Sequence, residues 1–188
     1  MPIIIGTMNN ETAFLLVRPA PEHETEIRAF RDELTETGSA MDGTGPLKHS
    51  EAPEDFIREC MLGEDPETVR KGLVPATQFL FVNEADGTII GMINIRHELN
   101  DSLRRLGGHI GYCIRPSYRG HGYAKTMLGE ALNFCRDTLH IPWVMLSCHA
   151  DNPASEHTIR GCGGVLERTS IDPENGKEVL IFTIPLSG

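Results

Sequence analysis

Long apolar runs and a basic leader segment are missing from this sequence of 188 residues. No apolar run approaches the roughly 18 residues that a membrane-spanning helix requires. The chain opens with Met-Pro-Ile-Ile-Ile-Gly, which lacks the basic region and the full apolar region of a secretory signal peptide. The five cysteines form no Cys-x-x-Cys pair, and most lie in apolar segments, so we expect free thiols in a reducing compartment. These absences predict a cytoplasmic protein that does not bind a membrane.

Basic residues are also scarce. The chain has 17 lysines and arginines against 27 acidic residues, which gives a formal net charge of −10. This argues against a general nucleic-acid binder, because such proteins hold backbone phosphates with lysine and arginine. An acidic surface favours a cationic substrate such as an amine, although acidity is also common among soluble proteins. Basic residues near one turn stand out as a predicted positive patch: Arg104, Arg105, Arg115, Arg119 and Lys125.

Hydrophobic periodicity predicts one α/β domain over residues 1–188, a mixed sheet with helices packed on it. Strands are predicted at residues 13–18, 77–83, 88–97, 107–115, 143–149, 165–171 and 178–184. Helices are predicted at residues 22–36, 53–62, 66–72, 121–138 and 153–161. Residues 38–50 carry turn chemistry and no period, which predicts a mobile loop that is either a connector or a lid facing substrate.

A glycine-rich turn between a predicted strand and a predicted helix is the most informative segment of the chain. Gly120 and Gly122 let the backbone approach a phosphate, and the N-terminus of the following helix supplies oriented N–H donors. The turn is not a P-loop, because Arg119 stands where that motif has its first glycine. It is not a dinucleotide-binding fingerprint either, because Lys125 stands where that motif has its third glycine.

The turn does fit the pattern R/Q-x-x-G-x-G/A, through Arg119, Gly122 and Ala124. It follows a strand that ends in Arg-Pro and precedes Asn152-Pro-Ala-Ser155 and Cys162-Gly-Gly164, so the segment 77–166 resembles the GCN5-related N-acetyltransferase (GNAT) superfamily. The segment 96–112 is similar to a bacterial group of predicted acetyltransferases. The resemblance implies a GNAT fold: a central mixed, mostly antiparallel sheet of about six or seven strands, splayed between its two central strands and flanked by about four helices. It further implies acetyl-CoA as co-substrate, no metal, and 77–166 as the acyl-CoA-binding core.

The resemblance places the co-substrate along one strand and the turn that follows it. The backbone of Tyr112, Cys113 and Ile114 is expected to pair with the pantetheine arm, and a backbone N–H there to hold the oxyanion formed at the thioester. Asn152 and Ser155 match positions that contact the cofactor near its thiol, although Asn152 is also a good helix cap. The diphosphate is expected on the turn itself, at Arg119, Gly120, His121, Gly122, Tyr123 and Ala124.

Acylation of an amine requires a neutral nucleophile, whereas an alkyl amine of pKa about 10 is mostly protonated at pH 7. A base, or a water relay to one, is therefore expected near the splayed strands. His109 is the first candidate, His97 the second and Glu98 the third. Many family members have a tyrosine where this chain has Ile159, as proton donor to the departing thiolate. Isoleucine cannot donate, so Ser155 or a water is expected to take that role.

The residues and the resemblance together predict an enzyme that moves acetyl from acetyl-CoA to the primary amine of a small molecule, directly and in a ternary complex. A covalent route through Cys113 or Cys148 is disfavoured, because neither thiol has a paired base. Two alternatives stay open: a protein or peptide N-acetyltransferase, and a non-catalytic acyl-CoA-binding sensor, which Ile159 suggests. The oligomeric state is open too, with a homodimer through the C-terminal strands as one option.

Overall fold

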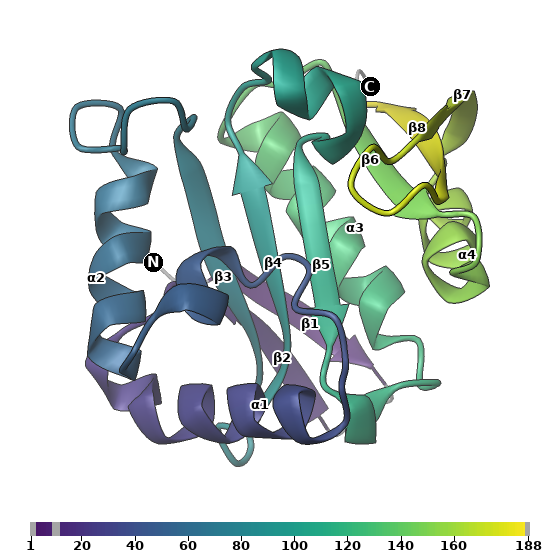
Figure 1. The fold of residues 1–188 in the computed structure, drawn as a ribbon. Coiled ribbons are helices and arrows are strands. Elements are labelled where there is room, and N and C mark those ends of the chain that lie inside the picture. The colour runs from purple at the N-terminus through teal and green to yellow at the C-terminus, as the bar shows by residue number, and fades with distance from the viewer. Residues whose placement is uncertain (1–2, 9–11, 187–188) are drawn as a thin grey trace.

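The computed structural model of the chain describes residues 3–8 and 12–186, which form two sheets and four α-helices (Figure 1). The first sheet is antiparallel and runs in the order β1 Ile3–Met8, β2 Thr12–Val17, β3 Ala76–Asn83, β4 Ile89–Arg96 and β5 Ile110–Ile114. The second sheet runs in the order β6 Trp143–His149, β8 Glu178–Pro185 and β7 Val165–Ile171. The helices are α1 Glu24–Glu36, α2 Pro53–Glu64, α3 Tyr123–Asp137 and α4 Pro153–Gly161. No helix within the described ranges is long and apolar enough to cross a membrane.

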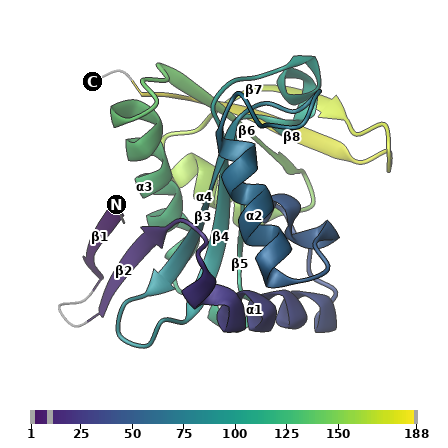
Figure 2. The same ribbon diagram turned by 90° about the vertical axis from the view of Figure 1, so that its left-hand side faces the viewer.

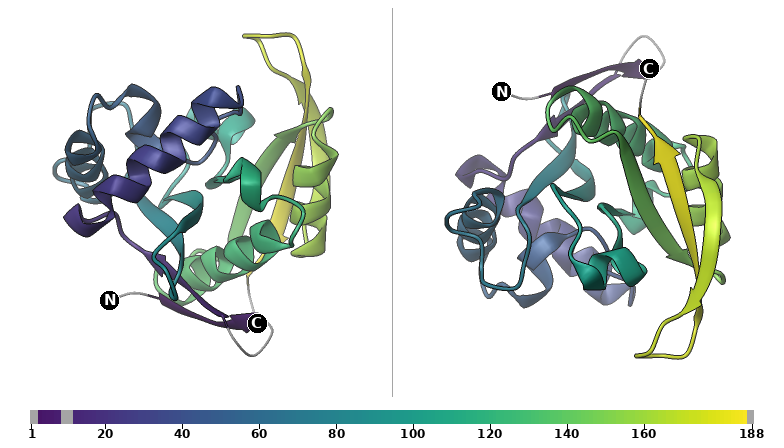
Figure 3. Two further views of the ribbon diagram at one scale, coloured as in Figure 1. Left: turned by 90° about the horizontal axis from the view of Figure 1, so that it is seen from below. Right: turned by 90° about the horizontal axis from the view of Figure 1, so that it is seen from above.

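The helices cover both faces of the first sheet. Helices α1 and α2 lie on one face and α3 lies on the other, as Figure 2 shows. Helix α4 packs beside α3 and against β6 of the second sheet (Figure 3). The sequence pattern explains this layering, because the buried positions of α3 recur at helical spacing and form one apolar stripe: Met127, Leu128, Ala131, Leu132, Phe134 and Cys135.

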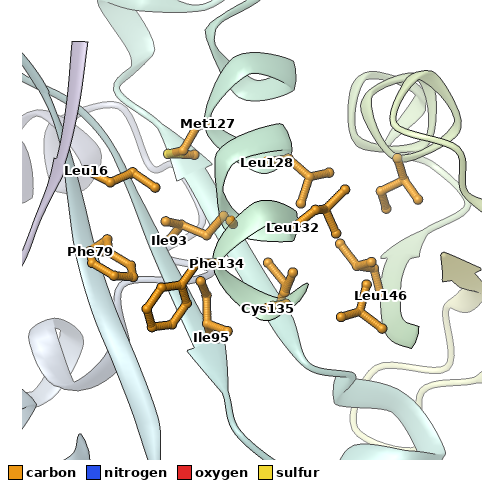
Figure 4. Close-up of a cluster of buried hydrophobic side chains, with 14 of the residues drawn as sticks. Leu16, Phe79, Ile93, Ile95, Met127, Leu128, Leu132, Phe134, Cys135 and Leu146 are labelled. Carbon is orange, nitrogen blue, oxygen red and sulfur yellow. The ribbon is translucent and has the colours of Figure 1, made fainter. Parts of the chain in front are cut away.

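Helix α3 packs against both sheets at once. Figure 4 shows Phe134 directed toward β3 of the first sheet, and Leu132 directed toward Leu146 of the second. The ring of Phe134 meets Phe79 of β3 edge-on, with the ring centroids 5.0 Å apart. The largest buried cluster therefore continues from β3 through α3 to β6 and fixes the two sheets relative to one another.

The two sheets touch at His109, the residue before β5. The His109 N–H donates to the Met145 carbonyl at 2.7 Å, and the Met145 N–H donates to His109 Nδ1 at 2.9 Å. Gly108 (φ +68°) allows this approach, because a Cβ on it would lie 2.4 Å from the Met145 carbonyl oxygen. Further along, the described residues of β5 pair with β4 alone and those of β6 pair with β8 alone. The sheet thus splits between β5 and β6, and the predicted fold class is confirmed.

The elements differ from the prediction in three places. The described strands number eight instead of six or seven, because Ile3–Met8 pairs with β2 as an extra strand. Residues 66–72 form turns and no helix, because the Asp65 carboxylate accepts from the Glu67 N–H and closes the backbone locally. Strand β5 starts later than predicted, because a π-helical turn at Leu103–Gly107 precedes it.

Residues 38–50, predicted to be a mobile loop, pack onto the first sheet. Gln78 of β3 donates from Nε2 to the Gly43 carbonyl at 3.0 Å, and Leu47 is buried in the cluster beneath α1 and α2. Gly43 (φ +70°) lies directly on β5, because a Cβ on it would come within 2.2 Å of the Gly111 carbonyl oxygen. The loop is therefore a fixed cover over β5, on the face opposite to α3.

Replacing Gly43 by alanine should destabilise the protein more than the same change at Gly38. Both glycines have left-handed φ values, +70° and +62°, so alanine costs about 1 kcal/mol of backbone strain at either position. An alanine at Gly43 also meets the backbone of β5, which should cost a further 1–3 kcal/mol or so. Nothing lies within 4 Å of a Cβ at Gly38. Urea unfolding measures both losses, and equal losses would contradict the packing of the loop on β5.

His109 should make the protein less stable in mild acid. Burial, with smaller contributions from Arg104 and Arg96, lowers the pKa of His109 from 6.5 to about 4. Between these values the unfolded chain binds a proton that the folded chain does not, so stability falls as the pH drops from 6.5 to 4, by up to about 3 kcal/mol. The variant His109→Asn should lose this part of the pH dependence, because its amide oxygen can still accept from Met145 but cannot titrate.

Urea unfolding at several pH values between 4.5 and 7 measures this effect. His157→Asn is the matched control, because His157 is exposed on α4. If His109→Asn keeps the pH dependence of the wild type, the imidazole of His109 is not buried in its neutral form.

Candidate active site

The glycine-rich turn presents bare backbone at the start of α3. Gly120 (φ +84°) and Gly122 (φ +81°) are exposed, and no atom lies within 4 Å of where a Cβ would sit on either residue. Gly122 directly precedes α3, and no side chain caps the helix there. Within the described part of the chain, the N–H groups of residues 120–124 donate to no backbone carbonyl. These donors and the positive end of the helix dipole suit a phosphate.

The side chains of the turn either anchor it or are exposed. Tyr123 packs in the apolar cluster between α3 and the first sheet, with the half-buried Ala124 beside it. His121 and Arg119 are exposed. Arg119 Nε donates to the Ile114 carbonyl at 3.1 Å, which ties the turn back to the end of β5.

Arg115, which the sequence assigned to a positive patch, is neutralised in the structure. Its guanidinium binds Glu26 at 3.0 Å and Glu33 at 2.6 Å, both from α1. Burial opposes the charged form of Glu33, but hydrogen bonds from Arg115 and Ser117 outweigh it and hold the Glu33 pKa below its usual value. Arg115 therefore fastens α1 to the end of β5 and does not contribute charge to the turn.

The other residues of the predicted positive patch do not lie together in the structure. Arg104 and Arg105 lie in the π-helical turn before β5, at the opposite end of that strand from Arg119. Arg119 and Lys125 are the cations that remain beside the exposed glycines. Among the described residues, neither of these two forms an ion pair. The patch at the turn is thus smaller than predicted, but its charge is available to a ligand.

One side-chain contact spans the split between the sheets. The hydroxyl of Tyr112 in β5 lies 3.0 Å from Ser155 Oγ in the first turn of α4. Burial raises the pKa of Tyr112 to about 12, so the phenol stays protonated at neutral pH. Asn152 Oδ1 accepts from the Ser155 N–H at 3.1 Å, and Asn152 is therefore a helix cap, as the sequence allowed. Two hydroxyls thus meet from opposite sides of the split.

The thiols near the split are buried. Cys113 and Ile114 complete β5, and burial raises the pKa of Cys113 to about 12. Burial also raises the pKa of Cys148 in β6. Such thiols are poor nucleophiles, because the thiolate is the reactive form. Ile159 is fully buried in the core, and hydroxyl groups at this place come from Tyr112, Ser155 and Thr158.

The two histidines predicted as bases are held by other contacts. His109 is 5% exposed, and it accepts from Met145 with Nδ1. Its pKa of about 4 makes it a weak base. His97 Nε2 lies 2.8 Å from Thr77 Oγ1, which donates to Glu64 at 2.8 Å, and burial lowers the pKa of His97 too. These contacts favour structural roles for both histidines.

A cavity of about 630 Å³ lies on the face of the first sheet that α1 and α2 cover. Gln78 of β3 and Asn94 and Arg96 of β4 line it from the sheet, and residues of α2 and of the segment 68–74 line it opposite. Asn94 donates to Gln78 Oε1 at 3.1 Å, and Gln78 also holds Gly43, so this wall and the loop over β5 form one hydrogen-bonded unit. The sequence prediction missed this cavity. The two amides within otherwise apolar strands were the signal that could have revealed it.

The chain matches a known protein family. The family model described as "Acetyltransferase (GNAT) domain" matches residues 14–165. A spermidine N(1)-acetyltransferase from Vibrio cholerae is 29% identical over 86 residues, which are 46% of this chain and 48% of that protein. The chain therefore matches about half the length of this curated relative.

Solved structures share the fold over nearly the whole chain. The ribosomal-protein-S5-alanine acetyltransferase from Vibrio fischeri has a TM-score of 0.72 at 14% identity, covering 97% of this chain and 96% of that one. The microcin C7 self-immunity acetyltransferase MccE, solved with acetyl-CoA and AMP, has a TM-score of 0.65 at 18% identity, covering 92% of each chain. The family model covers most of the sequence, and the chain thus belongs to the GNAT family of acetyl-CoA-dependent N-acetyltransferases.

Proposed function

We propose that this protein transfers the acetyl group of acetyl-CoA to the primary amine of a small molecule, directly and in a ternary complex. The observation that carries the proposal is a pair of sites: the turn that suits a phosphate, beside the split after β5, and the cavity of about 630 Å³ over β3 and β4. A cavity of this size fits a small acceptor. The spermidine acetyltransferase of Vibrio cholerae acts on a small amine, as its name states, which supports the same acceptor class. In this proposal residues 1–188 act as one domain, with 77–166 as the acyl-CoA-binding core.

The residues at the turn and the split fit coenzyme A. The free N–H groups of residues 120–124 and the charge of Arg119 suit its diphosphate. The edge of β5 at Tyr112, Cys113 and Ile114 is free to pair with the pantetheine, because β5 has β4 as its neighbour on the other side. Ser155 lies across the split from this edge, where its hydroxyl meets that of Tyr112, and Asn152 caps the same helix; these two residues would contact the cofactor near its thiol. When bound, acetyl-CoA supplies an acetyl group activated as a thioester.

Ser155 is the proposed proton donor to the sulfur that leaves, with Tyr112 behind it. The Ser155 hydroxyl would give its proton to the sulfur and recover one from the Tyr112 hydroxyl, 3.0 Å away. Tyr112 would regain its proton from water, which takes up the proton that the amine loses. A thiol of pKa about 8.5 is a fair leaving group, so this donor needs to contribute less than most general acids do. Many family members have a tyrosine as proton donor at the position of Ile159, and isoleucine cannot donate a proton. Ser155 and Tyr112 take over this role in the proposal, which favours an enzyme over an acyl-CoA sensor.

The amine is proposed to lose its proton to water instead of to a histidine. His109 uses Nδ1 to join the sheets, and His97 is bound to Thr77. His109 then has a positioning role, because it sets where β5 and β6 separate. The variant His109→Asn should accordingly keep the pH profile of kcat/KM of the wild type, and a profile shifted by this variant would restore His109 as the base.

Acetyl-CoA should bind the wild-type protein with a Kd below about 100 µM, within the usual range for enzyme substrates. Gly122→Ala should weaken binding at least about tenfold, because the methyl group enters the space in which the backbone meets the diphosphate. Gly176→Ala is the matched control, since Gly176 (φ +72°) has equal space around it but lies in the turn between β7 and β8. Isothermal titration measures both. The proposal fails if the wild type does not bind, or if both variants bind equally well.

Ser155→Ala and Tyr112→Phe should each lower kcat about tenfold or more while leaving the Kd for acetyl-CoA within a factor of about two. The double variant should lose little more than either single variant, because the two hydroxyls act in one chain of proton transfer. Thiol release measures kcat. Additive losses, or a kcat unaffected by Ser155→Ala, would show that the pair does not protonate the sulfur.

A further inference from the structure

Arg96, the last residue of β4, places a half-buried positive charge in the cavity. Its Nη1 donates to the Gly108 carbonyl at 3.1 Å, so one nitrogen of the guanidinium is engaged by the backbone. Burial lowers the pKa of Arg96, and Asp42 of the loop opposes this effect. Yet none of the ion pairs among the described residues includes Arg96. A half-buried cation that forms no ion pair is incompletely compensated, and a bound anion would stabilise it.

The other charged arginines that line the cavity are already paired. Arg58 binds Asp55 at 2.5 Å, and Arg70 binds Glu59 at 2.7 Å. Glu59 is the carboxylate among the lining residues, and Arg70 satisfies it. The charge left over in this cavity is therefore positive, although the protein as a whole carries a net charge of −10.

Arg96 also lies beside the strand on which the thioester is proposed to bind. A Cβ built on Gly111 of β5 would lie 3.9 Å from Arg96 Nη1 and 3.2 Å from the Gly43 nitrogen. Gly111 directly precedes Tyr112 in β5, and Gly43 lies over it on the face from which Arg96 approaches. An acceptor whose amine reaches this strand therefore brings the atoms next to its amine close to the guanidinium.

Apolar side chains contribute part of the remaining cavity surface. Leu62 of α2 and Leu73 line it and are 45% and 63% exposed. Leu103 lines the end near the π-helical turn. These side chains suit an apolar substituent of the acceptor.

We propose that the acceptor is a free amino acid with an apolar side chain, and that Arg96 binds its α-carboxylate beside the reacting amine. This inference rests on the proposed acetyl transfer and specifies its substrate class. A planar guanidinium matches a carboxylate in geometry and charge. A polyamine fits this cavity poorly, because its cationic chain would meet Arg96 and find no free carboxylate among the lining residues.

The test compares acceptors that differ in the carboxylate alone, by thiol release from acetyl-CoA. Phenylalanine should be acetylated with a kcat/KM at least about tenfold above that of phenylethylamine, of phenylalanine amide and of spermidine. Arg96→Gln should lower kcat/KM for phenylalanine at least about tenfold, mainly through KM, and leave phenylethylamine nearly unchanged. Arg96→Lys should keep part of the preference, because it keeps the charge. Arg58→Gln is the matched control, since Arg58 lines the same cavity but is paired with Asp55.

The possible outcomes separate this inference from the acetyl transfer itself. If the wild type prefers spermidine, phenylethylamine or phenylalanine amide, the inference is overturned and the proposed acetyl transfer is not affected. A preference for phenylalanine amide would indicate that the acceptor is the N-terminus of a peptide. An Arg96→Gln variant that loses activity equally on all acceptors, with unchanged affinity for acetyl-CoA, assigns Arg96 a structural role and also overturns it. If acetyl-CoA binds and no amine releases thiol, the proposed transfer is wrong. Titration of phenylalanine into the coenzyme A complexes of wild type and Arg96→Gln then decides whether the carboxylate site exists.

Discussion

The two hydrogen bonds between His109 and Met145 determine the geometry on which every proposed step depends. They join the two sheets at one point, while β5 keeps β4 and β6 keeps β8 as partners further along. Each strand therefore has one free edge facing the split. Strand β5 then leads directly into the glycine-rich turn, and Gly43 covers its other face. This contact, together with the packing of α3 against both sheets, positions the split and the turn.

The parts of the protein that the sequence predicted well are those that depend on neighbours along the chain. The turn at residues 119–124 could be predicted because its glycines, the preceding strand and the following amphipathic helix lie within one short segment. Helix α4 was predicted with its bounds because Asn152 and Pro153 mark its start locally. The GNAT resemblance added the split in the sheet, which no local pattern in the sequence indicates.

The parts that the sequence did not predict depend on partners far away in the chain. Arg115 looked like a free cation, but its partners Glu26 and Glu33 lie more than 80 residues earlier. The segment 38–50 looked mobile because its packing on β5 depends on contacts made across the sheet, through Gln78. No motif in the sequence marked Arg96 as a binding residue. Its unpaired charge becomes evident only when the carboxylates around the cavity have been assigned to other arginines.

The two proposed sites lie apart, the turn at the start of α3 and the cavity over β3 and β4 beside α2, which has a consequence for the order of binding. Coenzyme A is proposed to enter from the side of the turn and α3, and the acceptor from the side of α2, so that neither ligand covers the entrance used by the other. Either substrate can then bind first, and the acetylated product can leave while coenzyme A is still bound. Initial-rate kinetics should therefore follow a random sequential scheme, with neither substrate obliged to lead, and a strictly ordered scheme would mean that one ligand reshapes the entrance of the other.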